Sequence, residues 1–237
     1  IGKMPTEREL KSYYDDPGWF ESGLKGGYEA YDQQTEGTIP FVEGVLASVA
    51  KNKTYKSVLD IGCGYGTHLG VAQKYGWECF GVEISDHARQ IAIERHGDYA
   101  FIKSTVTELI PHEFDLILML DVIEHLPDPY VIFYELFAKG AIRKDTTVIV
   151  TTPNAQSIDA ITKREAWQYM HPPSHLIYYS AESIYQFFNH LKFKNIEISG
   201  QYKTEKSVTS GYTTEYSRND SIIENVALIS KVSGSDF

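Results

Sequence analysis

The feature that most constrains this chain is a short apolar run that ends near an acid and breaks at once into three alternating glycines. Residues 58–66 read VLDIGCGYG, with Asp60 ahead of Gly62, Gly64 and Gly66. An apolar run of this length, bounded by a turn, predicts a buried strand. Glycines lack a Cβ atom, so a ligand can approach the backbone of the turn closely. The sequence therefore predicts a strand and a tight turn that faces a ligand, followed by a helix whose first amides face it too.

A second acid stands at the end of the next predicted strand. Residues 77–83 end in Glu83, which follows Gly66 by seventeen positions. A carboxylate at the tip of the neighbouring strand is well placed to accept both hydroxyls of a ribose. The first half of the chain thus indicates a nucleoside-binding α/β protein. Without a ligand, the same turn is simply a tight connection between a strand and a helix.

The spacing of the glycines distinguishes between nucleosides. A dinucleotide-binding turn, G-x-G-x-x-G, would place its third glycine at Thr67, whereas this chain has it one residue earlier, at Gly66. The pattern acid-x-G-x-G-x-G, with Asp60 before it and Glu83 behind, resembles the class I S-adenosylmethionine (SAM)-dependent methyltransferases. The resemblance implies that Gly62, Gly64 and Gly66 contact the methionine part of SAM. It also implies that Asp60 steadies the amino group of SAM or the turn itself, that Glu83 binds the ribose, and that S-adenosylhomocysteine is the product.

A third segment extends the resemblance. Residues 114–120 predict a buried strand that runs into DVIEHLPDP at residues 121–129, at the strand edge where open α/β sheets bind ligands. That string is similar to the loop after the fourth strand in small-molecule methyltransferases, and the apolar run before Pro153 is similar to their fifth strand. The resemblance covers about residues 40–200 and a last strand near residue 225. It implies that Thr105 and Val106 flank the adenine and that Asp121 lies near the cofactor.

Strand and helix patterns alternate along the chain, which predicts an α/β fold. We expect a Rossmann-like class I methyltransferase sheet, mostly parallel with an antiparallel final strand, and with helices on both faces. Residues 1–40, rich in aromatic side chains, are expected to form a lid, and residues 41–237 the methyltransferase domain. Within that domain, the aromatic and proline-rich residues 155–180 predict a substrate-facing insertion. Residues 200–222 lack apolar periodicity and predict a long loop between two late strands.

Three histidines are candidates for acid–base chemistry. A hydroxyl or ammonium acceptor must lose a proton on methylation, and histidine titrates nearest neutral pH. His125 follows the fourth strand, and His171 and His175 lie in the insertion. The segment HLIYYS, residues 175–180, is similar to an H-L-x-x-(Y/F)-S pattern of methyltransferases that act on sugars and quinone precursors. It favours His175 as proton acceptor and His125 as a site-lining residue, the alternative for His175 being a bond to backbone or a helix cap.

Oxygen-bearing side chains that follow predicted strands could hold a metal ion. Catechol-type O-methyltransferases hold Mg²⁺ with carboxylate and amide oxygens, and Asp121, Glu124, Asp128 and Asn154 all follow predicted strands. Such residues also line metal-free sites, with Asp121 near the cofactor and Asn154 ending a strand. We therefore expect that no metal is required.

Composition excludes several classes of protein. The net charge is −10, from 22 basic and 32 acidic residues without any Lys/Arg cluster, which argues against a nucleic-acid partner. No apolar run reaches transmembrane length and no signal peptide opens the chain, so we expect a cytoplasmic protein without a membrane partner. Cys63 and Cys79 are expected to be buried thiols. The chain begins at Ile1, so either three residues precede a natural Met4 or the chain was excised from a larger polypeptide.

The expected function is transfer of a methyl group from SAM to a small-molecule or short-peptide acceptor, with oxygen favoured as the acceptor atom. Methylation at nitrogen or carbon is the alternative within enzymes, because all three share the displacement geometry. A second alternative is a non-catalytic SAM-binding module of a larger biosynthetic protein. The motifs are similar to those of ubiquinone-biosynthesis and sugar methyltransferases.

Overall fold

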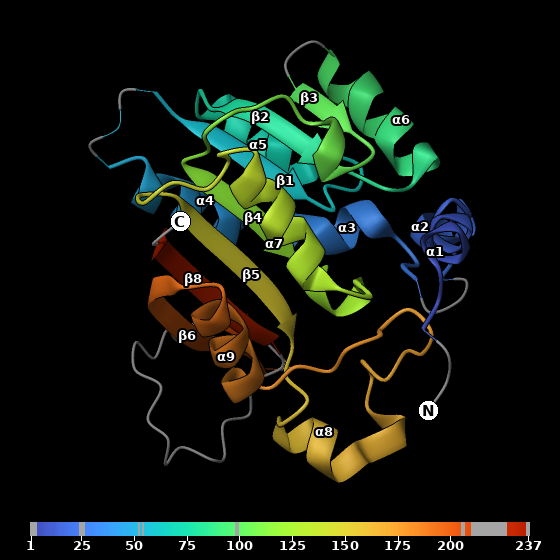
Figure 1. Cartoon of the computed structure of the whole chain (residues 1–237). Coiled ribbons are helices and arrows are strands. Elements are labelled where there is room, and N and C mark those ends of the chain that lie inside the picture. The colour runs from blue at the N-terminus through green and yellow to red at the C-terminus, as the bar shows by residue number, and fades with distance from the viewer. Residues whose placement is uncertain are drawn as a thin grey trace. The chain divides into compact units, whose positions relative to one another are not determined.

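The computed structural model describes residues 4–23, 27–51, 53, 55–97, 100–204, 207–209 and 227–235. By its internal contacts the chain divides into two units. The first comprises residues 1–118 and 130–142, and the second comprises residues 119–129 and 143–237. Each unit has strands and helices of its own (Figure 1).

The first unit is built on parallel strands in the order β3-β2-β1-β4. Asp60 pairs with Gly81 on one side and Leu118 on the other, which fixes the register of the three central strands. β1 is buried at every position, as expected for a parallel strand with side chains packed on both faces. The strands are β1 (Ser57–Ile61), β2 (Glu78–Val82), β3 (Ala100–Lys103) and β4 (Leu116–Leu120).

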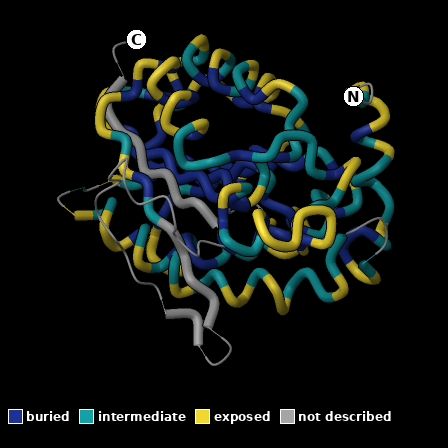
Figure 2. The backbone as a smooth tube through the Cα atoms, turned by 90° about the horizontal axis from the view of Figure 1, so that it is seen from below, coloured by how far each residue is buried: buried dark blue, intermediate teal, exposed yellow. Residues whose placement is uncertain are grey.

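Helices alternate with these strands, as the sequence predicts. α5 packs against β1 and β2, and α6 packs against β3. α6 begins after the expected N-cap, where Ser85 Oγ accepts the N–H of Ala88 at 3.2 Å. Figure 2 shows helical segments in which buried and exposed residues alternate along the tube. The helices are α4 (Ile39–Val49), α5 (Thr67–Lys74), α6 (Asp86–His96), α7 (Pro129–Ala138) and the 3-10 turn η3 (Val106–Glu108).

The N-terminal segment forms short helices. They are α1 (Glu7–Tyr14), α2 (Gly18–Glu21) and α3 (Tyr31–Glu36). α1 starts with a capping box in which Thr6 and Glu9 satisfy each other's backbone N–H groups. Trp19 and Phe20 of α2 are buried.

The second unit carries the late strands, in the order β5-β8-β6-β7. β8 (Ala227–Ser235) lies between β5 (Thr147–Pro153) and β6 (Phe193–Thr204) and is antiparallel to both, which confirms the predicted antiparallel final strand. The loop predicted over residues 200–222 is wrong at its start, because β6 continues to Thr204 and pairs there with β7 (Ser207–Thr209). The rest of that stretch, residues 210–222, lies outside the described residues.

The predicted insertion at residues 155–180 contains α8 (Ile158–Lys163), the 3-10 turn η5 (Arg164–Ala166) and an irregular stretch up to Ser180. Ser180 then caps α9 (Ala181–His190) with a Ser180–Ser183 capping box. Among the described residues no helix has the length and apolar character needed to cross a bilayer. Cys63 and Cys79 are buried free thiols, as expected.

Candidate functional site

The glycine turn, residues 62–66, leaves the end of β1 with a left-handed backbone at each of its glycines. The φ angles are 75° at Gly62, 52° at Gly64 and 78° at Gly66. Such angles favour glycine over residues with a Cβ atom. The turn is tied to β2, because the N–H groups of Gly62 and Cys63 both donate to the carbonyl of Val82, at 2.7 and 3.1 Å. The predicted strand, turn and helix are confirmed.

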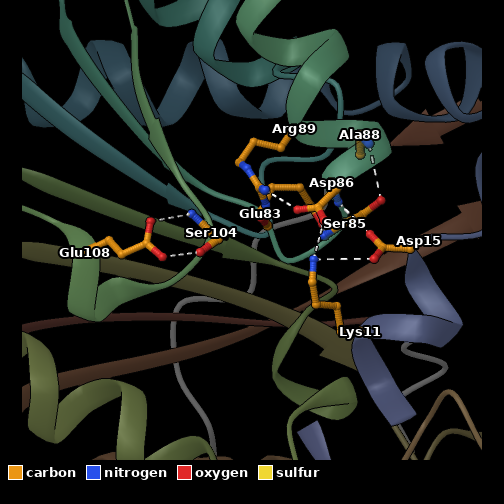
Figure 3. A network of polar contacts seen from close by, with 9 residues as sticks. All are labelled: Lys11, Asp15, Glu83, Ser85, Asp86, Ala88, Arg89, Ser104 and Glu108. Carbon is orange, nitrogen blue, oxygen red and sulfur yellow. Dashed lines mark hydrogen bonds and ion pairs between the residues drawn. The ribbon is translucent and has the colours of Figure 1, made fainter. Parts of the chain in front are cut away.

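Glu83 joins this turn to the start of α6. Its Oε2 accepts the N–H of Gly64 at 2.9 Å, and its Oε1 accepts the N–H of Ser85 at 2.8 Å. Burial raises the pKa of this carboxyl group, and the two donated N–H groups oppose that effect. Figure 3 shows Glu83 beside Ser85 and Arg89, whose guanidinium donates to the Glu83 carbonyl at 2.8 Å. Each carboxylate oxygen keeps acceptor capacity beyond one bond, so a ribose hydroxyl is compatible with this arrangement.

Asp60 lies within β1 and is only 1% exposed. Its Oδ2 has no hydrogen-bond partner and stands 3.6 Å from Nδ1 of His68. The other ring nitrogen of His68 lies 2.7 Å from the Thr38 hydroxyl. A buried carboxylate oxygen without a partner is uncommon in folded proteins. This oxygen is a suitable acceptor for the ammonium group of a bound amino acid.

Tyr31 covers the centre of the glycine turn. A Cβ atom built on Gly64 would stand 2.0 Å from the Tyr31 hydroxyl, so the ring rests directly on the backbone. Burial raises the pKa of Tyr31 well above its usual value, with smaller contributions from Tyr28 and Glu83. Gly66 is covered differently, because its absent Cβ would meet the His96 ring at 2.6 Å. The requirement for glycine at Gly66 therefore includes helix packing inside the protein.

Tyr31 belongs to an aromatic cluster that connects the N-terminal segment to the glycine turn. Phe20 stacks on Tyr65, with ring centroids 5.1 Å apart, and Tyr31 meets Tyr65 edge-on at 5.0 Å. Offset and edge-to-face pairs of this kind each contribute about 0.5–1.5 kcal/mol beyond the burial of area. The cluster consists of Trp19, Phe20, Tyr65 and Ala88, with Tyr13, Tyr14, Tyr28, Tyr31 and Ile91 packed against it.

Charged pairs fix the same segment to α6. Lys11 of α1 pairs with Asp86, and the Asp15 carboxylate accepts the N–H of Asp86 at 2.6 Å (Figure 3). Asp32 of α3, next to Tyr31, forms a bidentate pair with Arg95 at 2.8 and 2.7 Å. Arg95 lowers the pKa of Asp32 through these hydrogen bonds. The N-terminal segment is thus attached by aromatic packing and by ion pairs.

Thr105 and Val106 follow β3, whose Lys103 carbonyl accepts the N–H of Glu83 at 3.0 Å. Thr105 is exposed and precedes the 3-10 turn that begins at Val106, which is buried. The two residues therefore follow the strand beside the one that carries Glu83. Their contact with adenine stays a prediction.

Asp121 is the first residue after β4 and has an unusual backbone. Its φ of 54° lies in the left-handed region, which asparagine and aspartate tolerate better than most residues. Thr151 holds it there: the Asp121 N–H bonds the Thr151 carbonyl at 3.1 Å, and the Thr151 hydroxyl donates to Asp121 Oδ1 at 2.9 Å. Such outliers concentrate at functional sites.

The insertion closes onto the loop that follows Asp121. The N–H groups of Leu176 and Ile177 donate to the Glu124 carbonyl at 2.8 and 3.2 Å. Nδ1 of His125 lies 2.9 Å from the Ser174 carbonyl oxygen. Backbone and side-chain hydrogen bonds therefore hold together two segments that are about 50 positions apart in the sequence. The insertion therefore contacts the loop that carries the DVIEH residues.

That contact assembles a histidine cluster, which we define as Glu124, His125 and His175. One ligand atom from each of the three side chains lies within 4.8 Å of the other two. The imidazole rings of His125 and His175 are 4.7 Å apart and nearly perpendicular. Burial lowers the pKa of both rings, to about 3 for His125 and about 4 for His175. Both imidazoles are therefore neutral at physiological pH.

Several details of the predicted site need correction. Glu124, the sequence neighbour of His125, is a natural candidate to hold its ring by a hydrogen bond. Neither oxygen of the Glu124 carboxylate has a hydrogen-bond partner, however, and His125 bonds the Ser174 carbonyl. Asp128 is exposed, and Asn154 Oδ1 accepts the N–H of Gln156 at 2.9 Å in a local turn. The side chains whose ligand atoms lie close together are thus not the four oxygen-bearing residues considered for Mg²⁺. His171 supports the cluster, since its carbonyl accepts the N–H of His175 at 2.9 Å, and its ring centroid is 5.5 Å from that of His175.

Two features of the site escaped the sequence analysis. The position of Tyr31 on Gly64 depends on long-range packing, and its only trace in the sequence is the density of aromatic residues near it. The lack of a partner for the Glu124 carboxylate follows from the tertiary arrangement. The DVIEH string places Glu124 and His125 side by side, but nothing local specifies which groups surround them.

The chain is similar in sequence to known methyltransferases. A family model described as a methyltransferase domain matches residues 35–198. A ubiquinone biosynthesis O-methyltransferase of Nitrosospira multiformis is 32% identical over 81 residues, which cover 31% of this chain and 34% of that protein. The chain thus matches about a third of the length of this curated relative.

Two groups of solved structures share the fold. The plantazolicin methyltransferase BpumL, in complex with a pentazolic desmethylPZN analog and S-adenosylhomocysteine, superposes with a TM-score of 0.64 at 17% identity, covering 97% of this chain and 98% of that one. The magnesium protoporphyrin IX methyltransferase ChlM of Synechocystis, with bound S-adenosylhomocysteine, gives 0.63 at 17% identity, covering 97% and 100%. At such identities the similarity establishes the fold.

Proposed function

The chain belongs to the methyltransferase domain family and has the fold of the class I SAM-dependent methyltransferases, and from that premise we propose that it methylates an oxygen atom of a small molecule or short peptide. The observation that carries the proposal is the combination of two sets of residues. One is the glycine turn with Asp60 and Glu83, and the other is the histidine cluster. The ubiquinone biosynthesis O-methyltransferases among the relatives support oxygen as the acceptor atom.

The residues around the glycine turn fit SAM. The unpartnered Oδ2 of Asp60 suits the ammonium group of the methionine part, and the left-handed glycines allow close contact with the backbone. Glu83 retains acceptor capacity for ribose hydroxyls, and we assign Thr105 and Val106 to the adenine and Asp121 to the border of the cofactor site. When bound, SAM supplies an electrophilic methyl group on a sulfonium.

The acceptor is proposed to bind at the histidine cluster. As the acceptor oxygen bonds to the methyl carbon, the electron pair of the C–S bond stays on sulfur and the hydroxyl proton leaves. Nδ1 of His175 lies 2.8 Å from the Tyr169 carbonyl oxygen, so Nδ1 carries the hydrogen and Nε2 has the lone pair that can accept a proton. His125 and His171 position His175 and line the acceptor site.

We also propose that residues 1–40 act as a lid over the cofactor, with residues 41–237 as the methyltransferase domain and residues 155–180 as its acceptor-facing insertion. Support comes from the aromatic cluster, which places Tyr31 directly on Gly64. The net charge of −10 supports a small acceptor over a nucleic acid. A cytoplasmic location and excision from a larger polypeptide stay predictions.

The test is an incubation with deuteriomethyl-labelled SAM and a panel of phenols, catechols, carboxylates, amines and short peptides. We expect S-adenosylhomocysteine and a product labelled at oxygen, measured by mass spectrometry. Label found only on nitrogen or carbon would contradict the assignment of the acceptor atom. Tight SAM binding without transfer to any acceptor would instead support the non-catalytic module.

A matched pair of variants tests the cofactor assignment. Glu83→Ala is expected to weaken SAM binding at least tenfold, about 1.4 kcal/mol. The Gly64 and Ser85 N–H groups lose the carboxylate that accepts them, and the ribose hydroxyls lose the same acceptor. Glu78→Ala, at the opposite end of β2, serves as the control and is expected to bind SAM normally. Normal calorimetric binding by a folded Glu83→Ala variant would contradict the ribose assignment.

A further inference from the structure

The histidine cluster has the geometry of a metal site. The ligand atoms of Glu124, His125 and His175 lie within 4.8 Å of one another, close enough for small side-chain adjustments to bring them around one ion. They come from two segments that hydrogen bonds hold together, so the spacing is set by the fold. The side chains are largely withdrawn from solvent, and the Glu124 side chain is buried.

The hydrogen bonds of the two imidazoles indicate the same tautomer in both rings. Nδ1 of His125 lies 2.9 Å from the Ser174 carbonyl, and Nδ1 of His175 lies 2.8 Å from the Tyr169 carbonyl. A carbonyl oxygen only accepts, so Nδ1 carries the hydrogen in both rings and Nε2 carries the lone pair. Histidines that bind metals are oriented in the same way, by donating their second ring N–H to a carbonyl or carboxylate.

Glu124 gives an independent indication of a ligand. Glu124 is 2% exposed, and although the Thr152 hydroxyl lies near its carboxylate, neither carboxylate oxygen makes a hydrogen bond of normal geometry. Its backbone is fixed at the same time, because the Glu124 carbonyl accepts two N–H groups from the insertion. A buried carboxylate is costly unless it is paired, protonated or bound to a metal.

We propose that Glu124, His125 and His175 bind a divalent transition-metal or zinc ion that activates the acceptor hydroxyl. Two imidazole nitrogens and one carboxylate oxygen suit Zn²⁺, Mn²⁺, Co²⁺ or Fe²⁺ better than Mg²⁺ or Ca²⁺, which prefer oxygen ligands alone. The inference deepens the proposed function and rests on it for the identity of the reaction. It also replaces the expectation that no metal is required.

The role of the ion follows from its charge. A hydroxyl bound to the ion loses its proton to water at a lower pH, so the resulting oxyanion attacks the methyl carbon while the C–S electron pair stays on sulfur. In this arrangement His175 acts as a ligand, and no side chain has to take the proton.

The site itself is tested by titrating chelator-treated protein with Co²⁺ alone and recording visible absorption. We expect one equivalent per chain in the wild type and in His190→Ala, a matched control on the exposed end of α9. Glu124→Gln keeps the side-chain volume, and with His175→Ala it is expected to weaken Co²⁺ binding at least a hundredfold. Co²⁺ binding that is absent from the wild type, or unchanged in a folded Glu124→Gln variant, would overturn the site.

The second part of the test measures methyl transfer from labelled SAM. Loss of transfer on chelation and its return with Zn²⁺ or Mn²⁺ would support activation by the ion. Transfer that persists after complete chelation would overturn the ion's role and leave the proposed function intact, with His175 as proton acceptor. No transfer in either state would contradict the proposed function, while the Co²⁺ titration still decides whether the site exists.

Discussion

The glycine turn and the histidine cluster are built in different ways. The turn uses backbone that is specified within a few residues, and its left-handed glycines and the Glu83 carboxylate are held by short-range bonds and one neighbouring strand. The cluster uses side chains from two segments about 50 positions apart, brought together by bonds such as Leu176 N–H to the Glu124 carbonyl. The first kind of site can be located from local sequence, whereas the second depends on tertiary structure. Substitutions should therefore separate cofactor binding from turnover.

The largest expected effect is on turnover at the histidine cluster. His175→Ala should reduce turnover about a hundredfold or more, because the acceptor loses either its proton acceptor or a ligand of its activating ion. SAM affinity should stay within about twofold of the wild type, since no residue of the glycine turn is changed. Steady-state kinetics and calorimetry measure the two quantities, with the exposed His190→Ala as control. Equal turnover in the two variants would remove His175 from the mechanism.

The next largest effect is on SAM affinity at the glycine turn. Gly64→Ala adds a Cβ atom that meets the Tyr31 hydroxyl at 2.0 Å on a backbone with φ of 52°. We expect SAM binding to weaken by more than about tenfold, which calorimetry detects easily. Gly76→Ala is the matched control, because its φ of 74° carries the same backbone strain with nothing within 4 Å. Gly76→Ala should lose only about 1 kcal/mol of stability. An equal weakening of SAM binding in both variants would contradict a direct role for Gly64.

A smaller effect is expected on the rate of SAM binding. Tyr31→Ala removes the ring that rests on Gly64 and should speed SAM association several-fold, measured by stopped-flow fluorescence. Tyr28→Ala removes a neighbouring ring of the same cluster, 4.8 Å from Tyr31, and should leave the association rate unchanged. Each variant loses aromatic contacts of about 0.5–1.5 kcal/mol per pair. An unchanged rate in Tyr31→Ala would argue against a lid that opens at this residue.

The smallest effect concerns the pH dependence of stability. Arg95 lowers the pKa of Asp32 in the folded protein, so this pair contributes stability above the unfolded pKa of about 4 and loses it as the pH falls through the folded pKa. Asp32→Asn should therefore be less stable than the wild type at pH 7 by well under about 1 kcal/mol, because the pair is exposed to solvent. The difference should shrink as the pH falls below about 4, and it should also shrink in high salt. Urea unfolding at several pH values measures it, and a constant difference down to pH 3 would exclude this pair as its source.

Much of the fold could be predicted from the sequence, because its signals are local. Val58 to Ile61 form a buried strand, Ser85 and Ser180 cap helices, and alternating glycines mark the turn. The antiparallel final strand followed from resemblance to a family. The extension of β6 to Thr204 was missed because Gln201 to Thr204 carry no apolar alternation.

The candidate site was predictable only in part. Asp60 and Glu83 stand at strand ends that hydrophobic patterns reveal, whereas Tyr31 reaches Gly64 through packing of aromatic residues that no local pattern specifies. His125 and His175 were recognised separately from two motifs. That they share a cluster with an unpartnered Glu124 follows from the insertion folding back on the DVIEH loop, which is a long-range contact.

The most direct measurement is a crystal structure of the protein soaked with saturating S-adenosylhomocysteine. The account predicts the ligand on the glycine turn, with its ammonium group at Asp60, its ribose hydroxyls at Glu83, and the Tyr31 ring displaced from Gly64. A saturated crystal in which Tyr31 still rests on Gly64 and the ligand lies elsewhere, or nowhere, would contradict it.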